Sequence, residues 1–395
     1  MLPDGSTGAS GQIAAFMARR FGRDCLLVPS GRLALFLALR RFLTPGDRIL
    51  MSGVNDDVIF FVVLAAGLRP VIAPLSPLDG NIDVEAVPAE TWSSLSAVLT
   101  TNLYGLPDRM AELRARCARH GLMLIEDCAH AILTDIDSAP VGTFGAAAAL
   151  SLSKHVNAKI GGVLLLEQGG LMHEFGRLRD GLIVPRSARQ RMGERAGRTA
   201  RHALDMVGLM GAARRVRRLA GSAERTGYRM PLHPSRLSEA VAGQDTDLDL
   251  FDAWVRVDRH DYRAELTASH LDRIARHLDA LEAQRVRRIE GVRRLRELEA
   301  AAPAVQRGPA QPLFRVPLLV ENRDEVRADL ARRGIPTHYI YDPPLDDYAG
   351  PAFAEPSPNP EAARWWASHV LPVDPLRATE VLDALQTGRP LVPAC

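Results

Sequence analysis

The chain has 395 residues, of which 47% are hydrophobic, 24% charged and 5% aromatic. This composition is typical of a globular protein of about two domains and excludes a disordered, collagen-like or low-complexity chain. The formal net charge of +2 gives no overall signature of nucleic-acid or membrane binding, and no apolar run reaches the roughly 18 residues of a membrane-spanning helix.

Helical and strand patterns alternate through the first 170 residues. Helices are predicted at residues 10–22, 30–43, 56–67 and 107–121. Strands are predicted at residues 25–29, 48–53, 69–75, 96–103, 122–131, 145–154 and 160–167. This alternation predicts an α/β fold with a largely parallel sheet. Ligand sites in such sheets gather at the carboxyl ends of the strands, where we expect both Asp127 and Lys154.

The pattern breaks at about residues 170–250, where arginines accumulate. From Arg177 to Arg229 there are 14 arginines and 4 acidic residues, a balance of +10 that leaves −8 for the rest of the chain. Three interpretations of this arginine-rich insert stay open. It forms solvated helices over the site entrance or a dimer edge, or it binds an anionic substrate such as a nucleotide-linked sugar or carrier phosphopantetheine. The third is a membrane-surface patch, because apolar and basic stretches alternate.

The C-terminal third predicts a smaller α+β unit. Its expected elements are a long amphipathic helix at residues 267–298, a proline-rich joint at 300–312, strands at 314–320 and 335–341, and helices at 323–334 and near 378–385. We therefore predict two domains. Residues 1–255 form a large domain that contains the insert, and residues 256–395 form the long helix and a small C-terminal domain.

The four cysteines indicate the compartment. Cys25, Cys117, Cys128 and Cys395 are scattered, with no CxxC pair and no histidine at metal-ligand spacing. This pattern argues against a disulfide framework or a metal site and favours a reducing cytoplasm. The N-terminal residues lack a basic stretch followed by a long apolar run, so we expect no signal peptide.

The chain contains two lysines, Lys154 and Lys159, against 47 arginines. GC-rich codon usage explains most of this imbalance, but not why both lysines lie in one segment, SLSKHVNAKIGG. An amine can lose its proton and attack a carbonyl, whereas a guanidinium group effectively cannot. A lysine retained among so many arginines is therefore a candidate for Schiff-base chemistry.

Three features have the residue types that a pyridoxal 5′-phosphate site requires. Lys154 can hold the aldehyde as a Schiff base, and Asp127 can pair with the pyridinium nitrogen and keep it protonated. Ser30, Gly31 and Arg32 open a helix whose N–H groups and dipole favour a phosphate. Taken singly, the Ser-Gly pair is most often a helix cap and the aspartate a structural hydrogen-bond acceptor.

The order of the motifs resembles the DegT/StrS-type sugar aminotransferases, which are fold type I pyridoxal-phosphate enzymes. The segments that carry the resemblance are SGRLAL, GDRILM, AAGLRPVI, TTNLYGLPDRMAEL, GLMLIEDCAHAI, PVGTFG, KHVNAKIGG, ENRDEVRADLARRGIPTHYIYDPPL and VLPVDP. It covers about residues 10 to 385 apart from the insert. The resemblance implies a large, mostly parallel sheet domain, a smaller C-terminal α+β domain, and a homodimer whose sites are shared across the interface.

The resemblance also assigns roles to the residues around the expected cofactor. Lys154, seven positions before a Gly-Gly pair, is the lysine that binds the cofactor, while Lys159 falls where the family has glycine. Asp127 matches the aspartate of the family. His130 replaces a glutamine that faces the phenolic side of the cofactor.

The phosphate site follows the family in part. Gly31 and Arg32 match the pair whose backbone amides bind the phosphate. The family has a phosphate-binding serine five residues before the lysine, where this chain has Ala149. The segment is two residues shorter, which makes Ser151 the counterpart and Ser153 the alternative.

Some further positions depart from the family pattern, and one pair of residues matches its substrate contacts. The aromatic residue that stacks on the pyridine ring falls near Asp56. The cross-subunit Gly-x-Asn-x-Arg motif is reduced to residues 260–263, so that Asp261 replaces asparagine and Arg263 is expected to reach the phosphate of the neighbouring subunit. A GYRM segment at residues 227–230 imitates this motif. His338 and Tyr339 match a His-Tyr pair that approaches the substrate.

The resemblance implies an aminotransferase that moves an amino group from an amino acid, with glutamate as the expected donor, to a keto group. The acceptor would be a nucleotide-linked sugar or another intermediate of secondary metabolism. On this interpretation Lys154 also acts as the base that moves a proton between substrate carbon and cofactor. One alternative is a non-transaminating dehydratase or eliminase. The other is a cofactor-poor partner subunit that docks through the insert.

Overall fold

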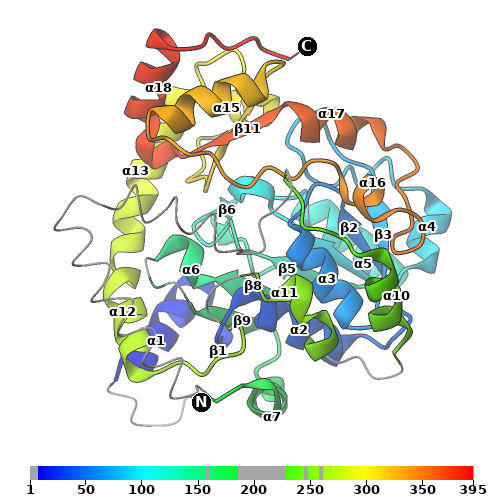
Figure 1. The fold of residues 1–395 in the computed structure, drawn as a ribbon. Helices are drawn as coiled ribbons and strands as arrows, with labels where there is room; N and C mark the ends of the chain where they lie inside the picture. Colours follow the sequence, from blue (N-terminus) through cyan, green and yellow to red (C-terminus); the bar gives the residue numbers. More distant parts are fainter. Residues whose placement is uncertain are drawn as a thin grey trace.

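The computed structural model describes residues 8–156, 158, 160–185, 228–243, 248–257 and 261–394. A seven-stranded sheet with the strand order β1-β9-β8-β5-β4-β2-β3 forms its centre (Figure 1). Its strands are β1 (Asp24–Val28), β2 (Arg48–Ser52), β3 (Arg69–Ala73), β4 (Ala97–Thr100), β5 (Met123–Asp127), β8 (Ala147–Ser151) and β9 (Gly162–Leu166). β9 pairs antiparallel with β1 and β8, and the other neighbours are parallel. The predicted largely parallel sheet is confirmed.

Helices cover both faces of this sheet, so its strands are buried on both sides. In β9, Leu164 and Leu166 pack with α2 and α3, whereas Val163 and Leu165 pack with α1 on the opposite face. The helices of this part are α1 (Ala9–Phe21), α2 (Gly31–Phe42), α3 (Asp57–Ala65), α4 (Ala89–Ser94), α5 (Met110–His120), α6 (Leu152–His155) and α7 (Met172–Leu182). Short elements complete it: η1 (Leu103–Gly105), β6 (Asp135–Ile136), β7 (Ala139–Pro140) and η2 (Gly169–Leu171).

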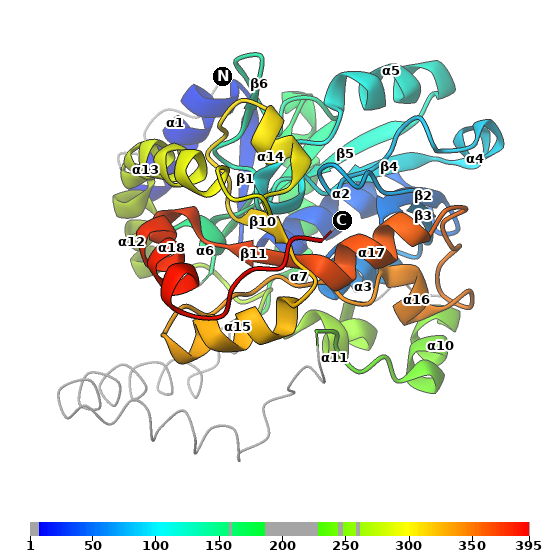
Figure 2. The same cartoon turned by 90° about the horizontal axis from the view of Figure 1, so that it is seen from above.

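A second group of helices links this layer to the C-terminal unit. These are α10 (Pro234–Ala242), η3 (Leu248–Phe251), α11 (Asp252–Val255), α12 (Ala268–Leu278) and α13 (Ala280–Leu295). α10 and α11 lie beside α3 (Figure 2), and α12 packs on α1. Each residue of α3 is buried, because the helix lies between the sheet and these helices. This burial on all sides explains why every residue after Asp57 is apolar.

The C-terminal unit lies over one end of the sheet (Figure 1). Its elements are α14 (Pro303–Arg307), β10 (Val316–Leu319), α15 (Arg323–Arg332), α16 (Leu345–Ala349), α17 (Glu361–His369), β11 (Val370–Val373), η4 (Pro375–Arg377) and α18 (Ala378–Thr387). β10 and β11 form an antiparallel pair. Val54, Leu103 and Tyr104, from loops after β2 and β4, belong to its core, so the two units share buried surface next to the strand ends.

Several predicted elements differ from the structure; the strands predicted at residues 96–103 and 122–131, for example, end at Thr100 and Asp127. No strand forms at residues 335–341, because the backbone of Tyr339 has a φ of 70°, which is incompatible with a strand. The single helix predicted at residues 267–298 is two helices that meet at Asp279. The strand predicted at residues 145–154 ends at Ser151, and Lys154 lies in the short helix α6.

Much of the arginine-rich insert, residues 186–227, lies outside the described residues, as does Lys159. The three interpretations of the insert therefore stay predictions. Among the residues that the structure describes, no helix has the length and apolar character needed to cross a membrane.

Candidate functional site

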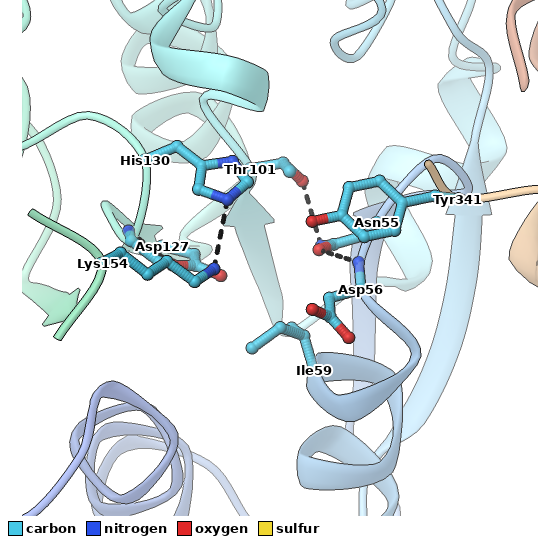
Figure 3. A pocket seen from close by; sticks show the side chains of 9 residues that line it. Asn55, Asp56, Ile59, Thr101, Asp127, His130, Lys154 and Tyr341 are labelled. Atoms are coloured by element: carbon cyan, nitrogen blue, oxygen red, sulfur yellow. Dashed lines mark hydrogen bonds between the residues drawn. The ribbon is translucent and has the colours of Figure 1, made fainter. Parts of the chain in front are cut away.

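Side chains from several strand ends meet in one pocket at the carboxyl edge of the parallel strands (Figure 3). It is lined by Asn55, Asp56, Ile59, Thr101, Asp127, Ala129, His130, Lys154 and Tyr341. Asn55 and Asp56 follow β2, Thr101 follows β4, Asp127 ends β5, and Lys154 follows β8. Asp127 and Lys154 both line this pocket, so they lie at the edge of the sheet where the sequence predicts them.

Lys154 is held close to His130. Its Nζ lies 3.1 Å from His130 Nε2 and 5.4 Å from the centre of the Tyr339 ring. Burial, and secondarily the positive charge of Lys154, hold the pKa of His130 well below its ordinary value. His130 is therefore neutral at physiological pH, and its Nε2 can accept a hydrogen bond from the Lys154 amine.

Asp127 presents a buried carboxylate to the same pocket. Its side chain Oδ1 accepts a hydrogen bond of 2.9 Å from the Ala129 N–H. Burial raises the pKa of this carboxyl to about 6, and the nearby charge of Lys154 opposes the increase. The group is thus mainly ionised at neutral pH, and a cationic ligand nitrogen would relieve the cost of burying its charge.

A buried aspartate that the sequence reasoning did not identify shapes another wall. Asp108 accepts backbone hydrogen bonds from Thr101 and Asn102, each 2.9 Å, and from Ile82 at 3.2 Å. These bonds fix the loop after β4. The Thr101 hydroxyl then accepts a bond of 3.2 Å from the Asn55 amide, which joins two pocket walls.

The start of α2 packs directly against the ends of β8 and β9. Ser30 caps the helix: its hydroxyl accepts from the Leu33 N–H at 3.2 Å. A Cβ on Gly31 would lie 3.2 Å from the Ser151 Cβ, and a Cβ on Gly162 would lie 2.3 Å from the Ser30 carbonyl carbon. Glycine at these positions lets the helix N-terminus approach Ser151, whose hydroxyl is 3.2 Å from that of Ser153. This arrangement can hold an anion.

The side chains of Arg32 and Arg263 contact other parts of their own chain, whereas the role expected of Arg32 belongs to its backbone amide and stays a prediction. The Arg32 guanidinium donates to the Val255 carbonyl and lies over the Tyr262 ring at 5.4 Å. The Arg263 guanidinium forms ion pairs with Asp249 and Asp252. Neither lines the pocket. The Arg263 N–H donates to Asp261 Oδ1 at 3.0 Å, so this aspartate stabilises the local turn.

The 335–344 segment brings a different residue to the pocket from the two predicted. Neither of these lines the pocket: Tyr339 lies beside it, with its ring 5.2 Å from that of His130, and His338 is exposed. Tyr341 lines it instead. The buried Arg229 donates to the backbone oxygens of Tyr341, at 3.1 Å, and Asn55, at 2.6 Å, and so joins the 335–344 segment to the loop after β2.

Sequence reasoning therefore missed Asn55, Thr101 and Tyr341. The first two directly follow parallel strands, so the rule that identified Asp127 also applies to them. Tyr341 carried no such signal, because its position depends on contacts between segments distant in the chain.

Known proteins with similar sequences include several aminotransferases. The chain is 29% identical to the GDP-perosamine synthase of Vibrio cholerae over 40% of this chain and 44% of that protein. It is 31% identical to the L-glutamine:2-deoxy-scyllo-inosose aminotransferase of Streptomyces kanamyceticus over 41% and 40%. The chain thus spans less than half the length of these relatives. Identity to the dTDP-4-dehydro-2,3,6-trideoxy-D-glucose 4-aminotransferase of Saccharopolyspora spinosa is 25% over 80% and 71%.

Solved structures share the fold over nearly the whole chain. A DegT DnrJ EryC1 StrS aminotransferase from Brucella abortus superimposes with a TM-score of 0.65 at 18% identity, covering 96% of this chain and 89% of that one. The GDP-4-keto-6-deoxy-D-mannose-3-dehydratase of E. coli, with bound hydrated PLP, gives 0.65 at 17% identity, covering 96% and 92%. A family model for these enzymes matches residues 12–211, about half of the chain. The chain belongs to the DegT/DnrJ/EryC1/StrS aminotransferase family.

Proposed function

We propose that the protein is a pyridoxal-phosphate-dependent aminotransferase that transfers an amino group from an amino acid to a keto group. The observation that carries this proposal is the pocket that Lys154 shares with Asp127 and His130, together with the start of α2, which packs on Ser151 three residues before Lys154. An amine, a buried carboxylate and an anion-binding helix N-terminus are the groups that a phosphorylated pyridine aldehyde requires.

The residues present fit the cofactor. Lys154 would hold it through its amine, Asp127 would pair with the ring nitrogen, and His130 would face the phenolic side. Ser151 and the backbone amides of Gly31 and Arg32 would hold the phosphate, because glycine lets the helix start reach the serine. When bound, the cofactor supplies an electron sink for the substrate.

The side chains of the pocket then move protons and orient the substrate. Once its amine is released from the cofactor by the amino donor, Lys154 Nζ would act as the base that moves a proton between the substrate carbon and the cofactor. His130, held neutral by burial, keeps that amine in place through its Nε2. Tyr339 beside the pocket limits the directions from which a substrate can approach.

The names of the relatives support the substrates we propose. The acceptor is a keto group on a nucleotide-linked sugar or a cyclic polyol, because the names of two relatives contain nucleotide-linked sugars and that of a third contains an inosose. The donor is glutamate or glutamine, the second of which is named for a relative. A polar pocket wall of Asn55, Thr101 and Tyr341 suits a hydroxylated acceptor.

We further propose a cytoplasmic homodimer. The unpaired cysteines Cys25, Cys117 and Cys128 support a reducing compartment. The dimer, the reach of Arg263 to the phosphate of the neighbouring subunit, and the division into residues 1–255 and 256–395 rest on the family pattern. A substrate contact of His338 and Tyr339 rests on it too.

A non-transaminating reaction is the second candidate, and Asp56 favours it. This residue brings a carboxylate into the pocket at the position where the family pattern implies an aromatic ring. The presence of Lys154 favours transamination, because this reaction needs an amine that takes a proton from the substrate carbon and passes it on.

The presence of only two lysines allows a direct test of the attachment residue. Wild-type protein is incubated with pyridoxal phosphate, reduced with borohydride and digested for mass spectrometry. We expect the label on Lys154, its loss in Lys154→Ala, and its retention in the matched control Lys159→Arg. A label on Lys159, or no label in the wild type, would contradict the proposal.

A further inference from the structure

His155 is a buried histidine that directly follows Lys154 in the short helix α6 and has no part in the proposed proton transfer. Its Nε2 lies 3.0 Å from the carbonyl oxygen of Ala129. A carbonyl oxygen only accepts hydrogen bonds, so Nε2 carries the ring proton and donates it. The His155 side chain thus joins α6, the helix of Lys154, to the segment that follows β5.

Ala129 stands where the pairing of β5 with β8 ends. The Cys128 N–H still donates to the backbone of β8 at 2.9 Å. The Ala129 N–H instead donates to Asp127 Oδ1 at 2.9 Å, and the Ala129 carbonyl accepts from His155. The His155 bond therefore fixes the residue that hydrogen-bonds the Asp127 carboxylate and that directly precedes His130.

The surroundings of His155 keep its ring neutral and in place. Burial, and secondarily the charge of Arg288, hold the pKa of His155 well below its ordinary value. Among the residues that the structure describes, its Nδ1 has no hydrogen-bond partner, so a proton on Nδ1 would be buried without an acceptor. The Phe314 ring lies 5.2 Å from the His155 ring and 4.6 Å from that of His130, so one aromatic side chain packs on both imidazoles. The neutral form with the proton on Nε2, which can donate to Ala129, is therefore favoured.

We propose that His155 is a positioning residue: through the Ala129 carbonyl it sets where the Asp127 carboxylate lies relative to the Lys154 amine. This inference rests on the proposed function, in which Lys154 and Asp127 hold two different atoms of one rigid ring. A displacement of either group then weakens binding of the cofactor. His155 does not line the pocket, so it acts through Ala129.

The first test compares the affinity of the wild type and two variants for pyridoxal phosphate. His155→Leu removes the donor and keeps the apolar bulk, whereas His155→Gln keeps an N–H donor at the position of Nε2. We expect the dissociation constant to rise about tenfold in His155→Leu, the factor that one buried hydrogen bond contributes, and at most about twofold in His155→Gln. The matched control is His277→Leu, which should leave this constant unchanged. The Nδ1 of His277 also lies close to a backbone carbonyl, that of Arg273 at 2.7 Å, but outside the pocket.

Amide hydrogen exchange gives a readout that needs no cofactor. In the protein without cofactor, peptides that span residues 127–131 should exchange about tenfold faster in His155→Leu than in the wild type, and at the wild-type rate in His155→Gln. Peptides from β3 and β10 should exchange at the same rate in all three proteins. A general loss of stability would instead speed exchange in these strands as well.

A double variant shows whether His155 acts through Asp127. Asp127→Asn removes the carboxylate that pairs with the ring nitrogen, so its position no longer matters. Adding His155→Leu to this variant should raise the dissociation constant by less than about twofold. A structural role of His155 unrelated to Asp127 would give the full tenfold rise again.

The inference is overturned by an unchanged affinity or unchanged exchange in His155→Leu, by an equal loss of affinity in His155→Gln or His277→Leu, or by the full effect in the double variant. If His155→Leu does not fold, His155→Asn takes its place, because the asparagine amide is too short to reach the position of Nε2. A wild-type protein that binds no pyridoxal phosphate would contradict the proposed function, whereas exchange at residues 127–131 would still test the bond from His155.

Discussion

At the scale of single residues, Asp127 links function to stability. Burial raises the pKa of this carboxyl to about 6, against about 4 in an unfolded chain. The folded protein binds this proton more tightly than the unfolded chain does, so stability falls as the pH rises from about 4 to about 6. Above that window, the charged group destabilises the protein without cofactor.

The Asp127→Asn variant tests this linkage. It keeps an acceptor for the Ala129 N–H and removes the charge. Without cofactor, we expect it to melt a few degrees above the wild type at pH 8 and at nearly the same temperature at pH 4. Cofactor affinity should fall at least about tenfold, because the partner of the ring nitrogen is lost. A stability difference independent of pH, measured by calorimetry, would refute this account.

The sequence predicts single residues well where strand ends carry polar groups. Asp127 and His130 follow an apolar strand, and Lys154 is one of two lysines, so each carries a signal in the sequence alone. Tyr341 carries none. Its place depends on a Tyr339 backbone with positive φ and on the Arg229 bonds, which join segments far apart in the chain.

At the scale of elements, the close packing of α2 against β9 depends on Gly162. A Cβ there would lie within 2.6 Å of backbone atoms of Ser30 and Gly31, so the helix start would have to move. We expect Gly162→Ala to lower both the melting temperature and the affinity for pyridoxal phosphate, the latter by at least about tenfold.

A matched control distinguishes this clash from a general effect of alanine. Gly176, in α7, has open space around the position of a Cβ, and alanine there favours the helix by up to about 1 kcal/mol. Gly176→Ala should leave cofactor affinity unchanged. Equal affinity losses in the two variants would show that the contact between α2 and β9 does not position the phosphate site.

The loop after β4 depends on Asp108. Its carboxylate accepts three backbone hydrogen bonds in a buried position, and truncation leaves these donors without partners. We expect Asp108→Ala to lower the free energy of unfolding by about 3 kcal/mol, measured in urea. Asp347→Ala, which breaks an exposed ion pair, should cost less than about 1 kcal/mol. Similar losses for both variants would show that Asp108 does not organise the loop.

Among the elements, the strands of the large sheet were predictable and the C-terminal connections were not. Continuous apolar runs such as that of β9 indicate strands buried on both faces. The 335–341 segment has a similar apolar and aromatic content, yet it forms no strand, and Tyr104 of the sheet unit stacks on Tyr341 and donates to the Tyr339 carbonyl. The local pattern of apolar residues cannot distinguish a buried strand from an irregular segment that packs on another part of the chain.

At the scale of the whole molecule, the pocket combines both units: Asn55 and Asp56 come from the sheet unit and Tyr341 from the C-terminal one. The proposed homodimer would add a second subunit, because Arg263 is expected to reach the phosphate of its neighbour. We expect sedimentation equilibrium at micromolar concentration to give twice the chain mass of 43.1 kDa. A monomer under these conditions would contradict the shared site.

The central claim is that the pocket around Lys154 carries out transamination. The most direct measurement follows the visible absorbance of the protein loaded with pyridoxal phosphate during addition of L-glutamate or L-glutamine, with Lys154→Ala as the control. Our account predicts a band in the wild type that bleaches as the amino group is transferred to the cofactor, and no such change in Lys154→Ala. A band that forms but persists with every amino donor would contradict it and favour a non-transaminating reaction.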